Sequence, residues 1–185
     1  MWELGEDTLS IFDTPDEWTG TIWARTGCVR DDHENFSCAT GDCKTNDIYC
    51  FNLTAKYPVT LINFAIQQSE ATYDVSLVHG YNVPVKIVPD GGSGDCVTTG
   101  CPNDVMNVCP AQLIFAGSNG TAIACHGPCD VLKDADACKS NQHSDMFKTT
   151  CPLASLFPGD AKSHKCNAAT YNITFCPLSP NSIEI

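Results

Sequence analysis

Residues 23–50 read WARTGCVRDDHENFSCATGDCKTNDIYC, and the interpretation of the fold starts from this stretch. Its cysteines are interspersed with glycine, asparagine and aspartate, which disfavour a helix or strand long enough to bury much surface. Cross-links must therefore hold the segment in shape. Structural zinc sites use paired C-x2–4-C units, whereas only Cys38 and Cys43 have such a spacing here, without a second unit. The stretch therefore favours disulfides over zinc.

Composition places the chain among secreted, cross-linked domains. Its 185 residues suit one domain, and a hydrophobic content of 43% is enough for a core. A reducing cytosol rarely contains proteins with 13 cysteines in such a length, so the count indicates a secreted or vacuolar compartment. Four N-glycosylation sequons point the same way, and their acceptors are Asn35, Asn52, Asn119 and Asn172.

The net charge of −12, from 22 acidic and 10 basic residues, restricts the partners. A surface this negative repels phosphate backbones and anionic lipids, so nucleic acid is excluded and membrane binding is disfavoured. No apolar run reaches the length that a membrane span needs, which is about 18 residues. The first residues have neither a basic region nor an apolar core, so no signal peptide is expected in this chain. We interpret it as a mature form or an N-terminal truncation.

Further motifs extend the pattern of residues 23–50 along the chain. They are YDVSLVHGYNVPVKIVP (73–89), GGSGDCVTTGCPNDVMNVCPAQL (91–113), ACHGPC (124–129), FKTTCPLA (147–154) and YNITFCP (171–177). Together with ARTGC and TGDC they resemble the signature of the thaumatin-like (pathogenesis-related class 5) family, from about residue 21 to residue 177. The resemblance implies a mainly β fold, namely an antiparallel β-sandwich with a helix-containing disulfide-rich lobe and a small disulfide-rich ribbon lobe.

The resemblance divides the chain into one thaumatin-like domain, 1–177, and a C-terminal tail, 178–185. Within the domain we expect three parts, listed here with their approximate bounds: the sandwich core in 1–26, 72–100, 110–124 and 166–177; the ribbon lobe in 27–57; and the helical lobe in 101–109 and 125–165. Many short strands with turn signals between them are typical of such a sandwich.

Local patterns predict individual strands. Residues 5–24 alternate loosely and predict two strands, with Leu9 and Ile11 facing inward. Alternation in residues 74–88 predicts a hairpin around the turn that begins at His79. An Asn-Gly turn at 119–120 predicts a second hairpin, and the alternating residues of 171–175 predict a final strand.

An odd number of cysteines leaves one thiol without an internal partner. The resemblance implies six disulfides, which are Cys28–Cys38, Cys43–Cys50, Cys96–Cys166, Cys101–Cys151, Cys109–Cys125 and Cys129–Cys138. Cys176 is then the free thiol, because the family cysteine that pairs with it has no counterpart here. We therefore interpret the chain as N-terminally truncated and as lacking the family's disulfide loop after Cys138. The family is monomeric, but we expect dimerisation of this chain through Cys176 or through a sheet edge that the missing first strand exposes.

The resemblance also implies a cleft between sandwich and helical lobe, lined by one arginine and four acids. A glutamate–aspartate pair in such a cleft could hydrolyse β-glucan. The corresponding positions in this chain are Arg25, Asn63, Asp74, His79 and, more loosely, Asp160. An amide at position 63 neither donates a proton near neutral pH nor acts as a carboxylate nucleophile, so we do not expect glucanase activity.

Roles for the other cleft positions stay open. We interpret His79 as a tolerated loop residue, with an acid–base role as the alternative. Asp74 either forms an ion pair with Arg25 or contacts a ligand. Tyr73 and Tyr81 are candidates for stacking against sugar rings, with Asn63 and Asp74 as hydrogen-bond partners of hydroxyls. The alternative is that these aromatic side chains belong to the core. The histidines lack a ligand spacing, so neither a metal nor a cofactor is predicted.

These observations predict a secreted defence-type, antifungal-like protein that binds cell-wall β-1,3-glucan without hydrolysing it. One alternative is a weak endo-β-1,3-glucanase that uses Asp74 with His79 or Asp160. Another is a glycosidase inhibitor or a different protein-interaction role, which the shortened helical lobe suggests. The predicted partner is therefore a cell-wall polysaccharide or a glycosidase.

Overall fold

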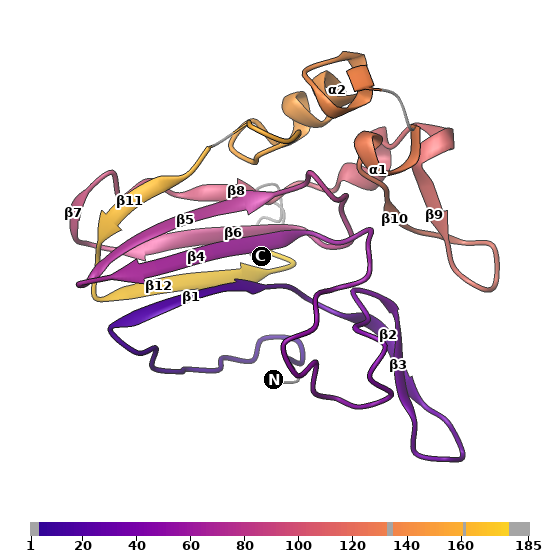
Figure 1. Cartoon of the computed structure of the whole chain (residues 1–185), viewed down its shortest axis with the longest axis horizontal. Coiled ribbons are helices and arrows are strands. Elements are labelled where there is room, and N and C mark those ends of the chain that lie inside the picture. Colours follow the sequence, from indigo (N-terminus) through magenta and orange to yellow (C-terminus); the bar gives the residue numbers. More distant parts are fainter. Residues whose placement is uncertain (1–3, 133–134, 161, 178–185) are drawn as a thin grey trace, which may run out of the picture.

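Two antiparallel sheets enclose the hydrophobic core (Figure 1), as seen in a computed structural model that describes residues 4–132, 135–160 and 162–177. The predicted tail, 178–185, lies outside the described residues. The larger sheet has the order β1-β4-β5-β11-β7, with β1 (Glu17–Ile22), β4 (Leu61–Gln67), β5 (Glu70–Ser76), β11 (His164–Asn167) and β7 (Ser93–Gly94). The smaller sheet has the order β12-β6-β8, with β12 (Thr170–Phe175), β6 (Val85–Asp90) and β8 (Thr99–Cys101).

Alternation along β4 and β5 produces the two faces of the larger sheet. Ile62 and Phe64 of β4 and Tyr73 and Val75 of β5 point into the core, where they meet Ile87 and other buried side chains of the smaller sheet. Their sequence neighbours point to the opposite face, because successive side chains of a strand alternate. The outer face of β4 and β5 is therefore available for a binding site.

The hairpin predicted for residues 74–88 is wrong. β5 pairs with β4 and β11, whereas β6 pairs with β12 and β8 in the other sheet. Residues 77–84 carry the chain from one sheet to the other. Gly80, at a φ of 103°, allows this crossing, since a Cβ there would lie 2.4 Å from the carbonyl oxygen of Cys125.

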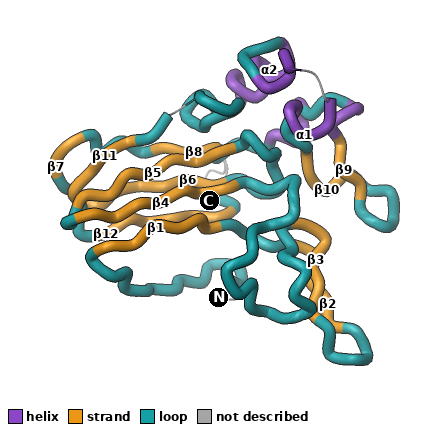
Figure 2. The backbone as a smooth tube through the Cα atoms, viewed as in Figure 1, coloured by secondary structure: helices purple, strands orange, loops and turns teal. Residues whose placement is uncertain are grey.

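The two strands predicted for residues 5–24 are also wrong. Only β1 forms, and residues 4–16 are loop (Figure 2). Leu9 and Ile11 are 81% and 84% exposed instead of facing inward. β1 is an edge strand that pairs with β4, so of the described residues 4–25, which we expected in the sandwich core, β1 alone belongs to a sheet.

Two hairpins lie beyond one end of the sandwich (Figure 1). β2 (Thr26–Arg30) and β3 (Phe36–Thr40) form the ribbon lobe with the loop that follows, and β9 (Ile114–Ala116) pairs with β10 (Ala122–Cys125) around the predicted Asn-Gly turn. The helical lobe contains α1 (Pro128–Leu132), α2 (Gln142–Thr150) and 3-10 helices at Val105–Val108, Ala111–Leu113 and Ala135–Cys138. None of the helices in the described ranges has the length and hydrophobicity of a membrane-spanning helix.

Six disulfides cross-link the sandwich and its two lobes, and they join the same six pairs of cysteines that the resemblance implies. Two of them cross-link the ribbon lobe, and the bridge between Cys96 and Cys166 ties β11 to the loop before β8. Cys176 has no disulfide partner and is exposed at the end of β12.

Cys176 makes disulfide-linked dimerisation testable. Nearby protein atoms partly desolvate the thiol and raise its pKa above the ordinary value, so little thiolate forms at pH 7 and oxidation should be slow there. We expect dimer formation in air to accelerate as the pH rises toward 9, and Cys176→Ser to abolish it. Non-reducing gels after thiol blocking measure both effects, and a dimer that persists in Cys176→Ser would contradict the assignment.

Candidate functional site

A row of polar side chains crosses three strands on the outer face of the larger sheet. The strand register places Thr21 of β1 opposite Asn63 of β4, and Asn63 opposite Asp74 of β5. Thr21 Oγ1 donates to Asn63 Oδ1 at 3.3 Å, and Asn63 Nδ2 donates to the two carboxylate oxygens of Asp74 at 3.3 and 3.4 Å. The sheet register therefore brings together two predicted site residues, Asn63 and Asp74.

These residues line a shallow groove of about 230 Å³ over β1, β4 and β5. The complete lining is Thr19, Gly20, Thr21, Asn63, Phe64, Ala65, Thr72 and Asp74. Asp74 is the one carboxylate in this set, and the remaining polar groups are hydroxyls and an amide. The volume is below the range of about 300–1,000 Å³ that is usual for enclosed ligand pockets, so the groove suits a ligand that lies across the sheet.

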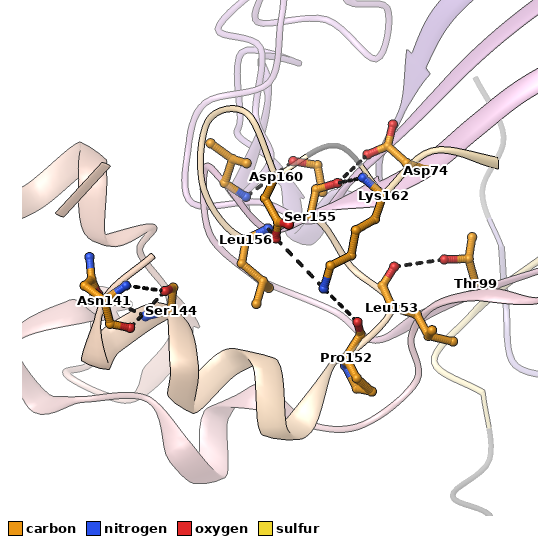
Figure 3. A network of polar contacts seen from close by, with 12 residues as sticks. Asp74, Thr99, Asn141, Ser144, Pro152, Leu153, Ser155, Leu156, Asp160 and Lys162 are labelled. Carbon is orange, nitrogen blue, oxygen red and sulfur yellow. Dashed lines mark hydrogen bonds and ion pairs between the residues drawn. The ribbon is translucent and has the colours of Figure 1, made fainter. Parts of the chain in front are cut away.

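A serine from a distant segment holds Asp74 in place. Ser155 Oγ donates to Asp74 Oδ2 at 3.3 Å and accepts from the backbone N–H of Lys162 at 3.3 Å (Figure 3). Burial raises the pKa of the Asp74 carboxyl above its ordinary value, and the hydrogen bonds from Asn63 and Ser155 oppose that rise only in part. Asp74 is thus a constrained carboxylate that carries its charge at a cost in stability.

This cost can be measured by removing the charge. A carboxyl whose pKa is higher in the folded than in the unfolded state destabilises the fold once the pH is above the folded-state pKa. Asp74→Asn, which keeps an acceptor for Asn63, should therefore raise the melting temperature at pH 7. The gain should disappear toward pH 3, where the wild-type carboxyl is protonated in both states. Calorimetry at both pH values checks this, and a gain that is equal at pH 3 and pH 7 would contradict it.

Asp160 supports a loop and does not line the groove. Its Oδ2 accepts from the backbone N–H of Leu156 at 3.0 Å and lies 3.9 Å from Lys162 Nζ, which donates to the carbonyl of Pro152 at 2.7 Å (Figure 3). The carboxylate is thereby committed to the turn that places Ser155. Asp160 acts on the groove through that turn.

Arg25 turns toward the ribbon lobe. Its guanidinium donates to the carbonyl of Ile48 at 2.6 Å and lies over the ring of Phe36 at 4.7 Å. Desolvation lowers the pKa of Arg25, and Asp42 and Asp47 oppose this. The ion pair considered between Arg25 and Asp74 does not form among the described residues, whose ion pairs join other side chains. The Asp74 carboxylate is hydrogen-bonded by Asn63 and Ser155.

His79 links the sandwich to the helical lobe. Its Nδ1 lies 3.1–3.2 Å from the carboxylate oxygens of Asp130 in α1, and its ring stacks on Tyr57 with centroids 3.9 Å apart. An Nδ1–H tautomer donates to that carboxylate. His79 is a loop residue, as predicted, and it also makes this contact to the helical lobe; it does not line the groove. A nearby cavity of about 40 Å³, lined in part by Tyr57, has room for about one water molecule.

Tyr73 and Tyr81 do not stack on a ligand. Tyr73 is 0% and Tyr81 is 2% exposed, and both belong to the hydrophobic core. Their hydroxyls are used internally, since Tyr73 donates to the carbonyl of Val97 at 2.7 Å and Tyr81 to that of Asn103 at 3.3 Å. The interpretation of these two residues as sugar-stacking groups is wrong: Tyr73 is on the inward face of β5, and Tyr81 is buried in the segment that crosses between the sheets.

The sequence analysis did not predict Thr21, Ser155 and Asp130, which hydrogen-bond to Asn63, Asp74 and His79. Thr21 could have been found only with the register between β1 and β4. Ser155 is 81 residues from Asp74 and Asp130 is 51 residues from His79, so no local pattern connects them. Among the residues that the structure describes, no group of three histidine, cysteine or acidic side chains is arranged to hold a metal ion.

The comparisons with known proteins agree with this architecture. A model of the thaumatin family matches residues 1–177. Similar proteins include "Glucan endo-1,3-beta-glucosidase" of Prunus avium, 38% identical over 95% of this chain and 78% of that protein. "Thaumatin-like protein 1" of Arabidopsis thaliana is 38% identical over 97% of this chain and 76% of that protein.

A solved structure shares the fold. The thaumatin-like xylanase inhibitor TLXI matches with a TM-score of 0.51 at 21% identity, over 91% of this chain and 77% of its own. At that identity the likeness concerns the fold alone. The predicted antiparallel sandwich with disulfide-rich lobes is thereby confirmed. From the family match and the sequence identities, this chain belongs to the thaumatin family.

Proposed function

We propose that this protein is a secreted or vacuolar, defence-type protein that binds cell-wall β-glucan and does not hydrolyse it. The observation that carries the proposal is the groove over β1, β4 and β5, in which Asp74 is the single carboxylate of the lining. Hydroxyl, amide and carboxylate groups in one row are suited to the hydroxyls of a neutral polysaccharide. The negative net charge is compatible with a neutral ligand.

Glycoside hydrolysis needs two carboxyl groups on opposite sides of the scissile bond, about 5–9.5 Å apart. Asn63 stands directly across the strand pair from Asp74 and already donates to both oxygens of that carboxylate. An amide there cannot replace the missing acid. Because Phe64, the one aromatic residue of the lining, is buried, hydrogen bonds carry the binding. We expect a dissociation constant of about 0.1–1 mM for a short glucan.

Retention on insoluble β-1,3-glucan tests the proposal. Asp74→Ala removes a hydrogen-bonding carboxylate and should weaken retention about tenfold. Asp90→Asn, at an exposed carboxylate at the end of β6, is the matched control and should be retained like wild type. Equal retention of wild type and Asp74→Ala, or no retention of wild type, would refute glucan binding by this groove.

A weak endo-β-1,3-glucanase is the second candidate, and two observations favour it. The raised pKa of Asp74 is a property of general acids, and the Prunus avium relative carries the name of such an enzyme. Release of reducing sugar from laminarin by wild type, abolished in Asp74→Ala, would support it against our proposal. Asn63→Glu should create the carboxyl pair and raise the activity if the rest of the groove is intact. The glycosidase-inhibitor alternative stays a prediction.

A further inference from the structure

The ribbon lobe exposes an aromatic pair that the groove does not use. Tyr49 and Phe51 are 55% and 67% exposed, and their ring centroids lie 6.0 Å apart at an interplanar angle of 50°. Leu53 beside them is also exposed. Clustered apolar groups on the surface of a soluble protein usually mark a place where something binds. We call Tyr49, Phe51 and Leu53 the aromatic patch. A glycan attached to the chain itself is a candidate for the group that covers this patch, because Asn52 of the sequon Asn52-Leu53-Thr54 lies within it.

The backbone holds Asn52 at the tip of a tight turn. Phe51 and Asn52 have φ values of 45° and 67°, and the N–H of Leu53 donates to the carbonyl of Cys50 at 2.8 Å. Two successive positive φ values with this hydrogen bond are typical of a type I′ turn. Asparagine tolerates the left-handed conformation better than most residues. The turn therefore projects Asn52 outward between the two exposed neighbours in its sequence.

The segment that precedes the turn, residues 43–50, is held by a disulfide and by side-chain hydrogen bonds. Cys50 is bonded to Cys43, and Thr45 Oγ1 donates to the carbonyl of Tyr49 at 2.8 Å. The backbone N–H of Tyr49 donates to Asp47 Oδ1 at 3.1 Å. A surface that is ordered before it meets its ligand loses less entropy on contact.

Asn52 differs from two of the other sequon asparagines. The Nδ2 of Asn35 donates to Asp31 at 2.9 Å, and the Oδ1 of Asn119 accepts from the N–H of Thr121 at 3.0 Å. Within the described ranges, the exposed Asn52 side chain has no hydrogen-bond partner. Asn172 is exposed too, but it lies within β12 between half-buried neighbours. Asn52 is thus the sequon whose amide lies beside an exposed aromatic pair.

We infer that Asn52 carries an N-linked glycan whose first N-acetylglucosamine packs on Phe51 and Tyr49. In the attachment step, Asn52 Nδ2 displaces the diphosphate of a lipid-diphosphate-linked oligosaccharide on a secretory-pathway transferase. The C1–O bond of the first sugar breaks, a C1–N bond forms, the diphosphate leaves with the electron pair, and one amide proton passes to a base of the transferase. The C–H face of the attached sugar then covers the aromatic patch, which removes apolar surface from water.

The test uses the full chain secreted from a eukaryotic host, with glycopeptide mass spectrometry to establish occupancy at Asn52. Thr54→Ala removes the sequon and leaves Asn52 in its turn. We expect it to lower the melting temperature by about 2–4 °C. In a Phe51→Ala background, the same substitution should lower it by less than about 1 °C. Thr121→Ala removes the Asn119 sequon, and its effect should not depend on Phe51.

Three results would overturn the inference. One is an unmodified Asn52 in protein that is glycosylated elsewhere. Another is a glycan at Asn52 whose effect on the melting temperature is the same in the wild-type and Phe51→Ala backgrounds. The third is Phe51-dependent binding of free triacetylchitotriose to the glycosylated wild type, because the attached sugar would then not cover the patch. Phe51 and Thr54 are exposed, so these variants should fold.

Discussion

Replacing Cys96 and Cys166 together by alanine is expected to lower the free energy of unfolding by about 3 kcal/mol. The two cysteines are 70 residues apart, and a loop of that length alone would predict more than about 4 kcal/mol from chain entropy. The bridge between Cys101 and Cys151 reduces this figure because it lies inside the longer loop. With the inner bridge intact, the outer one closes only about 20 further residues.

The nesting gives a second expectation. Removing the inner bridge alone should also cost about 3 kcal/mol, because the outer bridge still limits the unfolded chain. Removing both should cost about 7 kcal/mol, which is more than the two single costs together, since no cross-link then restricts these segments. Both bridges lie in the core region, where Cys101, Cys151 and Cys166 are buried, so the alanine variants also lose packing.

Urea unfolding in a Cys176→Ser background measures these differences without disulfide exchange from the free thiol. Replacing Cys28 and Cys38 by alanine is the matched control, since it also removes one bridge. That bridge closes a hairpin with a sequence separation of 10, and its loss should cost about 2.5 kcal/mol. A smaller cost for the pair Cys96 and Cys166 than for this control would contradict the loop argument.

The sequence predicted the parts of the fold that depend on local signals and on the family motifs. The Asn-Gly turn at 119–120 predicted the β9–β10 hairpin, and alternation in 171–175 predicted β12. The antiparallel sandwich with its disulfide-rich lobes followed from the resemblance. For the β9–β10 hairpin the signal is local, because Gly120 has a φ of 79°, which glycine adopts readily.

Pairing between strands was not predictable in the same way. Alternation in residues 74–88 shows that two strands form, but it does not show which neighbours complete their hydrogen bonds. The sheet change at residues 77–84 depends on contacts with Cys125, about 45 residues further along the chain. The sequence therefore predicted the strands correctly and their partnership wrongly.

The candidate site shows the same division. Asp74 and Asn63 face one groove because they are opposite each other in the register. Tyr73 is adjacent to Asp74, so the two side chains must point to opposite faces of the sheet. The Tyr73 ring therefore cannot reach a ligand that the Asp74 carboxylate contacts on the outer face, and this rule was available from the sequence. The support from Ser155 was not, because it comes from a loop in the distant helical lobe.

Asn82→Ala is expected to destabilise the fold by about 3–5 kcal/mol, which is large for a single polar side chain. Asn82 is buried where the chain crosses between the sheets. Its Oδ1 accepts from the N–H of Thr60 at 3.0 Å, and its Nδ2 donates to the carbonyl of Ala24 at 3.0 Å and to Thr40 Oγ1 at 2.8 Å. Alanine would leave the Thr60 N–H and the Ala24 carbonyl without this partner, and each stranded group costs about 1–3 kcal/mol. Thr40 Oγ1 would lose one bond and keep its bond to Thr26 Oγ1 at 2.7 Å.

The same bonds connect the ribbon lobe to the sandwich, because Thr40 ends β3 and Thr60 precedes β4. We therefore expect Asn82→Ala to lower the melting temperature by about 10–15 °C and to increase hydrogen exchange at the N–H of Thr60. The exposed Asn107 is the matched control, and Asn107→Ala should change stability by less than about 0.5 kcal/mol. A loss in Asn82→Ala no larger than in this control would mean that water replaces the lost bonds, and that the Asn82 side chain does not hold the segments around Ala24, Thr40 and Thr60 together.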